Sequence, residues 1–203
     1  MKNKPQPFSD EEKECTDGVF DGLAIKGKTV TARSFYGCLF RNCDLTGVTF
    51  KNCRFRDCRF ESCNLSLAAV RGSSFFSTSF KDSKLAGVDW TAAAWPLIKL
   101  PGALEFAGCL LNDCSFFGLC LKGARLTNCM ARESDFREAD LSGADLTHTD
   151  FVGSLFGKTD LRGANLDQAR NYAISVSDNK VKDARFSMPE AMALLYCLDI
   201  KIV

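Results

Sequence analysis

Eleven cysteines and one histidine are the residues of this 203-residue chain whose chemistry is easiest to name. Cysteines in such number can form disulfides or bind zinc. Zinc sites commonly use CxxC pairs, and the sequence contains none. The lone His148 cannot supply the several imidazoles of a histidine metal site, and it leaves little scope for acid–base catalysis. We therefore expect no metal site and no cofactor.

The sequence context also disfavours disulfides. Residues 1–10 lack the apolar stretch of a signal peptide, and the cysteine count is odd. No apolar run approaches the about 20 residues that a membrane span needs. We expect a cytoplasmic protein with reduced thiols and no membrane contact.

The charges nearly cancel, with 26 basic and 25 acidic residues and a formal net charge of +1. This total excludes a strongly basic nucleic-acid binder and a uniformly acidic chain. The sequence also lacks a phosphate-binding loop, a GxSxG motif and a metal-binding triad. An enzyme is not expected.

The spacing of the cysteines is five residues, and the apolar residues share it. Every fifth residue is apolar from Phe20 to Leu100, and after a slip of one position the pattern continues from Phe106 to Phe186. Only Asn171 breaks the rule. We call each of these central residues i. A period of five fits neither a helix nor a flat strand, and indicates a chain that turns a corner every five residues.

The glycines support this interpretation. Thirteen of the 15 glycines lie at position i+2, where a corner with positive φ favours glycine. Four such corners close a square coil, and coils joined by backbone hydrogen bonds stack about 4.8 Å apart. The sequence therefore predicts an all-β solenoid of about eight coils.

Most cysteines have a fixed place in this coil, at position i−2. Other units fill i−2 with small residues, so we expect it to point inward, where cysteine acts as a small apolar filler. Cysteines one coil apart come within disulfide reach, but parallel side chains suit the disulfide torsion poorly. The stacked pairs are Cys38 with Cys58, Cys43 with Cys63 and Cys109 with Cys129, and the other i−2 cysteines are Cys53 and Cys114.

Individual units resemble a known consensus. Residues 53–57 (CRFRD), 139–143 (ADLSG) and 164–168 (ANLDQ) are similar to the A(D/N)LXX unit of pentapeptide-repeat proteins. The resemblance covers residues 18–187 and implies a right-handed quadrilateral β-helix. The repeat alone says little about function, because proteins that carry it have many roles.

The middle and the tail resemble one branch of that family, the Qnr, McbG and AlbG type, with AlbG the most similar. The matching segments are 87–91 (GVDWT), 102–106 (GALEF), 109–116 (CLLNDCSF) and 184–200. The resemblance implies a dimeric rod that imitates DNA, binds DNA gyrase or a related type II topoisomerase, and protects it from quinolones, albicidin or microcin-like toxins. It implies no direct nucleic-acid binding. The alternative is a repeat scaffold or adaptor with a different protein partner.

The charge is unevenly distributed along the chain. Residues 41–84 carry a net charge of +4, and residues 133–167 carry −5. A dimer joined at its C-termini would gather the acids at its centre, where they could imitate phosphates and face gyrase. Alternatively, the acids only solvate a rod whose repeat contains A-D-L. The candidate acids are Asp135, Glu138, Asp140, Asp145, Asp150 and Asp160.

The phase break at residues 91–105 is a second candidate surface. Two tryptophans on the central phase would overfill a coil, and prolines interrupt a ladder of backbone hydrogen bonds. The phase slips by one position, so we expect a one-residue insertion and a kinked or bulged coil rather than a long loop. The break either only accommodates the slip or contacts a partner. Its marked residues are Trp90, Trp95, Pro96 and Pro101.

Both ends depart from the repeat. Residues 1–17 form an N-terminal segment, and residues 188–203 predict a short helix (191–198) followed by a strand (199–203). Ser187 and Glu190 are spaced as a capping box. The tail either only covers the last coil or, as the resemblance implies, forms a two-fold dimer contact. The contact residues would be Met192, Leu195, Tyr196, Leu198, Ile200 and Ile202.

Overall fold

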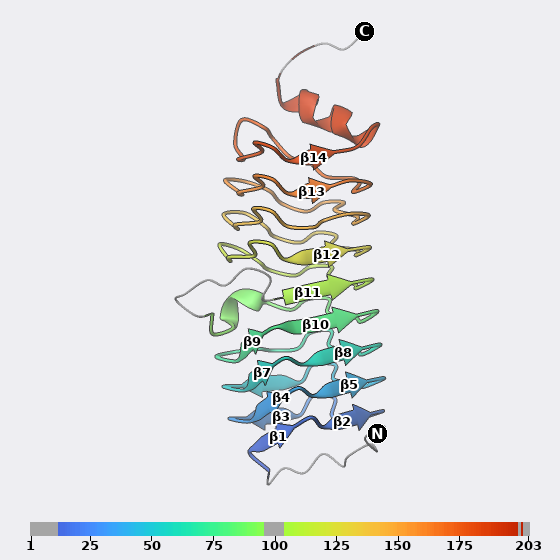
Figure 1. Ribbon diagram of the computed structural model, residues 1–203, viewed down its shortest axis with the longest axis vertical. Helices are drawn as coiled ribbons and strands as arrows, with labels where there is room; N and C mark the ends of the chain where they lie inside the picture. Colours follow the sequence, from blue (N-terminus) through green and yellow to red (C-terminus); the bar gives the residue numbers. More distant parts are fainter. Residues whose placement is uncertain (1–11, 96–103, 199, 201–203) are drawn as a thin grey trace.

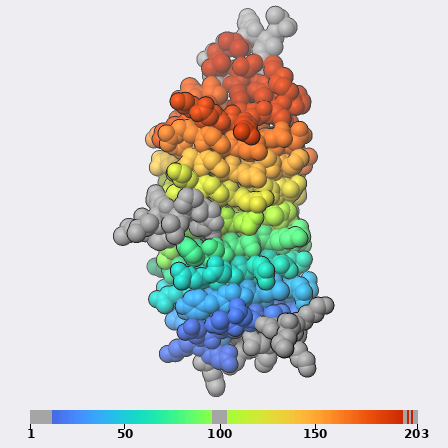
Figure 2. Space-filling model, viewed as in Figure 1, coloured from blue at the N-terminus to red at the C-terminus, as the bar shows by residue number. Residues whose placement is uncertain are grey.

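The computed structural model describes residues 12–95, 104–198 and 200, and shows a rod of stacked coils with the first coil at one tip and the C-terminal helix at the other (Figure 1). About eight turns of parallel β-structure form the rod, which confirms the predicted quadrilateral solenoid. In the space-filling view each coil is a band across the rod (Figure 2). The strands are β1 (Glu14–Thr16), β2 (Val19–Asp21), β3 (Thr29–Thr31), β4 (Ser34–Tyr36), β5 (Leu39–Arg41), β6 (Thr49–Lys51), β7 (Arg54–Arg56), β8 (Arg59–Glu61), β9 (Ser74–Phe76), β10 (Thr78–Lys81), β11 (Leu104–Ala107), β12 (Arg125–Thr127), β13 (Asn165–Leu166) and β14 (Arg185–Phe186).

Four faces make up the rod, and residues 20 apart stack on the same face. Phe40 pairs with Phe60 on one face, and Phe35 pairs with Phe55 on another. Face 1 contains β2, β5, β8, β10, β11 and β12, and face 4 contains β1, β4, β7 and β9. Face 2 has central residues 25, 45, 65 and 85, and face 3 has 30, 50, 70 and 90.

The corners explain the glycines. Twelve glycines have φ between 62° and 74°, and all lie at i+2. Eighteen other residues also have positive φ, and half of them are Asn or Asp, the types that adopt this conformation at the lowest cost. At Gly153 a Cβ would in addition collide with the carboxylate of Glu133. Backbone geometry therefore selects the corner residues.

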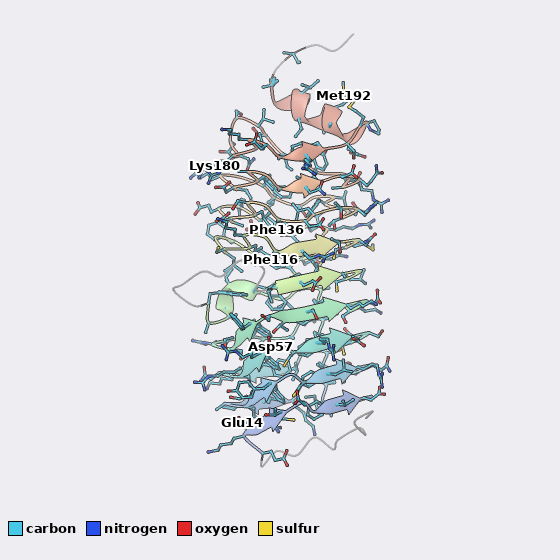
Figure 3. The ribbon with its side chains drawn as sticks, in the orientation of Figure 1. Glu14, Asp57, Phe116, Phe136, Lys180 and Met192 are labelled. Atoms are coloured by element: carbon cyan, nitrogen blue, oxygen red, sulfur yellow. The ribbon has the colours of Figure 1, made fainter. Side chains whose placement is uncertain are left out.

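The interior is a column of stacked rings in the first five coils. Phe60 lies 4.6 Å from Phe40 and 4.9 Å from Phe80, with ring planes within 13° of parallel. Phe116 and Phe136 continue the stacking further up the rod at 5.0 Å (Figure 3). The apolar period of five is thus the core itself.

The i−2 side chains point inward as predicted, and they also form hydrogen bonds. The thiol of Cys58 donates to the carbonyl oxygen of Phe35 at 3.4 Å, and Ser134 Oγ donates to that of Leu111 at 2.6 Å. The ten cysteines whose side chains the structure describes have free thiols. Cysteine is therefore a hydrogen-bond donor here as well as a small filler.

The phase break is longer than predicted. Phe80 pairs with Phe106, 26 positions away, which is six more than the 20 of an ordinary coil. The expectation of a one-residue insertion in a bulged coil is therefore wrong. The insertion comprises one complete unit of five residues plus one residue. A complete unit does not change the phase of the five-residue pattern, so only the single extra residue is visible in the sequence. The six extra residues lie between Trp95 and Phe106.

Trp90 is a core residue rather than a surface one. Its side chain is buried between Phe75, Phe80 and Phe106, with ring centroids 5.3–5.6 Å apart. It begins the 3₁₀ helix η1 (Trp90–Ala92). Trp95 is half-buried and its Nε1 donates to the Trp90 carbonyl at 2.9 Å, whereas Pro96 and Pro101 lie outside the described residues.

The ends also differ from expectation. β1 pairs with β4, so the coil already begins within the predicted N-terminal segment 1–17. The predicted C-terminal helix is present as the 3₁₀ helix η2 (Glu190–Leu198), and the predicted strand lies outside the described residues apart from Ile200. No helix in the described ranges is long and apolar enough to cross a membrane.

In the last coil one inward position moves by a single residue, and the spacing of 20 is regained at Lys180. Tyr172 fills the interior in place of Asn171, and its ring lies 5.6 Å from that of Phe186. Burial raises the pKa of Tyr172 to about 12. Ser187 Oγ and Glu190 Oε2 accept hydrogen bonds from the backbone N–H groups of Gln168 and Asn171, instead of closing the predicted capping box.

Candidate functional surfaces

The acidic segment is spread over all four faces. Asp140 and Asp160 stack on face 4, as predicted, and Asp145 lies on face 1. Asp135 lies on face 3 and Glu138 on the corner that follows it. The sixth candidate, Asp150, belongs to face 2. The acids therefore surround the rod and do not form a stripe.

Asp150 is buried, which contradicts its predicted role in facing a partner. Its side chain is 2% exposed, and its carboxylate accepts hydrogen bonds from Arg132 Nη2 (2.7 Å) and Asn171 Nδ2 (2.8 Å). Arg170 adds a second cation at 3.8 Å. Burial alone would raise the pKa of Asp150, but these hydrogen bonds outweigh it and the pKa is lowered.

Asp160 is also unavailable as a free acid. Its side chain is 11% exposed and bonds to Arg162 Nη2 at 2.6 Å, with Lys180 at 3.6 Å. Asp135 bonds to Arg137 in the same way, at 2.7 Å. In both cases hydrogen bonds from the arginine hold the pKa of the carboxyl below its usual range.

The net charge of −5 therefore overstates the acidity of this region. Coil stacking brings in bases from outside residues 133–167, namely Arg132, Arg170 and Lys180. Asp145 has Arg125 at 4.0 Å, and Glu138 has Lys158 at 3.9 Å. Asp140 is the candidate acid without an ion pair in the described part of the chain. Asp135 is also partly exposed but is bound tightly to Arg137, so the candidate acids at the surface without an ion pair shorter than 3.9 Å are Glu138, Asp140 and Asp145.

Apart from Cys120, the thiols that the structure describes are buried. Burial raises the pKa of Cys15 to about 11 and that of Cys114 to about 12, so both are protonated at neutral pH. Cys120 is half-buried, 4.0 Å from an Asp140 oxygen. No group of three metal-ligating side chains occurs among the described residues.

A pocket of about 420 Å³ lies where the tail folds over the last coil. Sequence reasoning missed it, because it depends on how residues 187–190 pack against the corner residue of face 1. His148 is exposed at its edge, as predicted for a corner residue. The lining residues are His148, Gln168, Ala169, Arg170, Ser187, Met188, Pro189 and Glu190.

Comparison with known sequences identifies the repeat. Residues 33–103 match the family described as Pentapeptide repeat region, and residues 120–157 and 134–170 match Pentapeptide repeats (8 copies). Together these segments cover more than half of the chain. The chain is a pentapeptide repeat protein. No sequence among the curated proteins matches it.

Solved structures of QnrB1 match this chain over most of its length. One trypsin-treated variant of QnrB1, a plasmid-mediated fluoroquinolone resistance protein, is 17% identical with a TM-score of 0.70, over 99% of this chain and 95% of that one. A second trypsin-treated QnrB1 variant gives 18% identity and a TM-score of 0.64, over 92% and 100%. Full-length QnrB1 gives 16% and 0.51, over 92% and 90%. At this identity the similarity shows a common fold.

The tail of this pentapeptide repeat protein exposes apolar side chains at the tip of the rod. Met188 is 68% exposed, Leu198 47% and Ile200 53%. Met192 and Leu195 are half-buried, whereas the Tyr196 side chain and Ile202 lie outside what the structure describes. The apolar tip contrasts with the polar coils beneath it.

Proposed function

We propose that this pentapeptide repeat protein binds DNA gyrase, or a related type II topoisomerase, and protects it from poisons without being an enzyme. The observation that carries the proposal is the end-to-end structural similarity to QnrB1, a fluoroquinolone resistance protein. The sequence resemblance in the middle and tail adds to it. The proposal places the protein in the cytoplasm, where the buried free thiols stay reduced.

The rod shape supports imitation of DNA. About eight coils at about 4.8 Å spacing give a rod of roughly 40 Å, and a dimer joined tip to tip reaches roughly 80 Å. That is the length of about 24 base pairs at about 3.4 Å each. Direct binding of nucleic acid is not part of this mechanism.

The dimer contact belongs to the apolar tip. Leu198 and Ile200 are exposed there, and burying them against a second copy removes apolar surface from water. Met192 and Leu195 would extend the contact. The double variant Leu198→Asp with Ile200→Asp should sediment as a monomer under conditions where the wild type is a dimer. A monomeric wild type would contradict the contact.

Of the six candidate acids, we propose that Glu138, Asp140 and Asp145 face the enzyme. These acids keep solvent contact, whereas Asp150 and Asp160 are buried. We assign the three the role of phosphate mimics that meet basic side chains of the topoisomerase.

A supercoiling assay with purified gyrase tests the function. With a quinolone, albicidin or a microcin-like toxin present in separate reactions, the protein should restore supercoiling with at least one of them. This comparison also tells whether the AlbG-like or the Qnr-like specificity applies. The absence of protection and of inhibition over a wide concentration range would refute the proposal.

A matched pair of variants tests the acidic surface. Reversing Glu138, Asp140 and Asp145 to Lys should abolish protection. The control reverses Asp57, Asp82 and Asp113, three exposed corner acids at positions where Lys158 shows that lysine is accepted. If both triple variants fold and protect equally, the three acids do not face the enzyme.

A further inference from the structure

The third coil carries a dense group of exposed bases. Lys51, Arg54, Arg56 and Arg59 lie within nine residues, and Arg71 follows one coil further along. We name these five residues the basic belt. All five side chains are exposed, and one acid, Asp57, lies within the run.

These bases differ from those of the other half in having no ion-pair partner among the described residues. Between Lys122 and Arg185, seven of ten bases lie within 4.0 Å of a carboxylate. None of the five belt residues does. Arg56 instead lies over the ring of Phe76, at 5.0 Å. The belt is thus the largest run of uncompensated charge in the part of the chain that the structure describes.

The belt bends around the rod. Lys51 and Arg71 lie on face 3, Arg54 and Arg56 on face 4, and Arg59 on face 1. Duplex DNA is stiff, with a persistence length of about 50 nm, so it would touch one edge of the belt only. A flexible extended chain, which advances about 3.3 Å per residue, can follow the coil around both corners.

The backbone N–H and C=O groups beneath the belt already form hydrogen bonds with neighbouring strands. β7 pairs with β4 and β9, and β8 pairs with β5 and β10. A partner therefore cannot add as a further strand, and must be held by its side chains. Guanidinium groups bind carboxylates through two parallel hydrogen bonds. The adjoining ring of Phe76 is covered by Arg56, which disfavours base stacking by a single-stranded nucleic acid.

We propose that the basic belt binds an acidic segment of a partner protein, in extended conformation, through ion pairs along the third coil. The proposal is independent of gyrase binding. The partner is defined by chemistry: several Asp or Glu residues on a flexible chain long enough to pass two corners.

Fluorescence anisotropy with a labelled oligoglutamate of about twelve residues tests this proposal on the full-length protein. The triple variant Arg54→Glu, Arg56→Glu, Arg59→Glu should weaken binding by about tenfold or more. The matched control reverses Lys122, Lys182 and Arg185, three exposed bases on faces 4 and 1 that also lack ion pairs in the described residues. It should change the affinity by less than about twofold.

Three outcomes would overturn the proposal: no binding by the wild type, equal loss in both triple variants, or tighter binding of an oligothymidylate of equal charge at the same salt concentration. The last would assign the belt to nucleic acid. Circular dichroism checks the fold of each variant. If the charge reversal unfolds the rod, Arg54→Gln with Arg56→Gln should still weaken peptide binding by about threefold, and unchanged binding would refute the belt.

Discussion

The two halves of this rod, residues 12–95 and 104–187, use one backbone coil with different side chains. Rings fill the core of the first half, where Phe40, Phe60 and Phe80 stack on face 1. Phe106 continues this stack into the second half, and leucines follow it on the same face at 126, 146 and 166. The backbone register is the same in both, since residues 20 apart pair throughout each half. The coil therefore depends on size and polarity at position i, and not on aromatic character.

The outer surfaces differ in a second way. In the second half, acids and bases neutralise each other across neighbouring coils, as in the bond from Arg132 to Asp150, and within one unit, as in the bond from Arg162 to Asp160. In the first half, the basic belt stays unpaired among the described residues. Because i−1 and i+1 point outward, the surface charge can change while the core is kept. On a solenoid, the net charge of a sequence segment is therefore a poor guide to the charge that is left unpaired at the surface.

The largest expected loss of stability comes from core substitutions, and it should differ between the two halves. Phe60→Ala should lower the free energy of unfolding by about 3–5 kcal/mol, because it leaves a cavity and breaks two ring stacks. Leu146→Ala, at the equivalent position of face 1, should cost about 2–3 kcal/mol. Urea unfolding followed by circular dichroism measures both. Equal losses would mean that ring stacking adds nothing to the first half.

The sequence was sufficient to predict most of the fold. The period of five identified the coil, the inward residues and the corners, because each depends on local geometry repeated many times. The length of the phase break could not be predicted from the sequence. An insertion of one unit plus one residue moves the phase of the five-residue pattern by one position, as an insertion of a single residue does. The exchange of Asn171 for Tyr172 in the core was not predicted either, because the shift is local: the 20-residue spacing is regained at Lys180, so the later units keep the same phase.

The candidate acidic surface was predicted less well. Asp150 and Asp160 occupy i−1, a position that faces outward in most units, yet both are buried. Arg132 lies 18 residues from Asp150, and Lys180 lies 20 residues from Asp160. Both bases are therefore outside residues 133–167. Treating residues about 20 apart as neighbours would have found them. The basic belt, by contrast, is local, and its lack of partners could be seen only in the structure.

An effect of intermediate size on stability is expected from pH, through the acids that form ion pairs. The pKa values of Asp135, Asp150 and Asp160 are lowered on folding, so their stabilisation is full above the unfolded pKa of about 3.9. It is lost as the pH falls through the lower folded values. Asp150→Ala should cost about 1.5–3 kcal/mol at pH near 7, and much less at pH near 3.

Urea unfolding of wild type and Asp150→Ala at both pH values measures this difference. Asp57→Ala, in the first half and without an ion pair in the described residues, is the control, and its cost, which comes from the positive φ of that corner, should be the same at both pH values. A cost of Asp150→Ala that stays constant with pH would show that packing, and not its charge, stabilises the second half.

The smallest effect concerns position i−2, where either a thiol or a hydroxyl donates the same hydrogen bond, and both kinds of donor occur in each half. Cys63 Sγ donates to the Phe40 carbonyl at 3.3 Å in the first half, and Ser134 Oγ donates to that of Leu111 at 2.6 Å in the second. Exchanging the two, as Cys63→Ser or Ser134→Cys, should change the free energy of unfolding by less than about 1 kcal/mol, since either donor satisfies the carbonyl. Ser134→Ala should cost about 1 kcal/mol, because the donor is lost. If Ser134→Ala proves as mild as Ser134→Cys in urea unfolding, the inward position is selected for volume alone, and the hydrogen bond at i−2 does not stabilise either half.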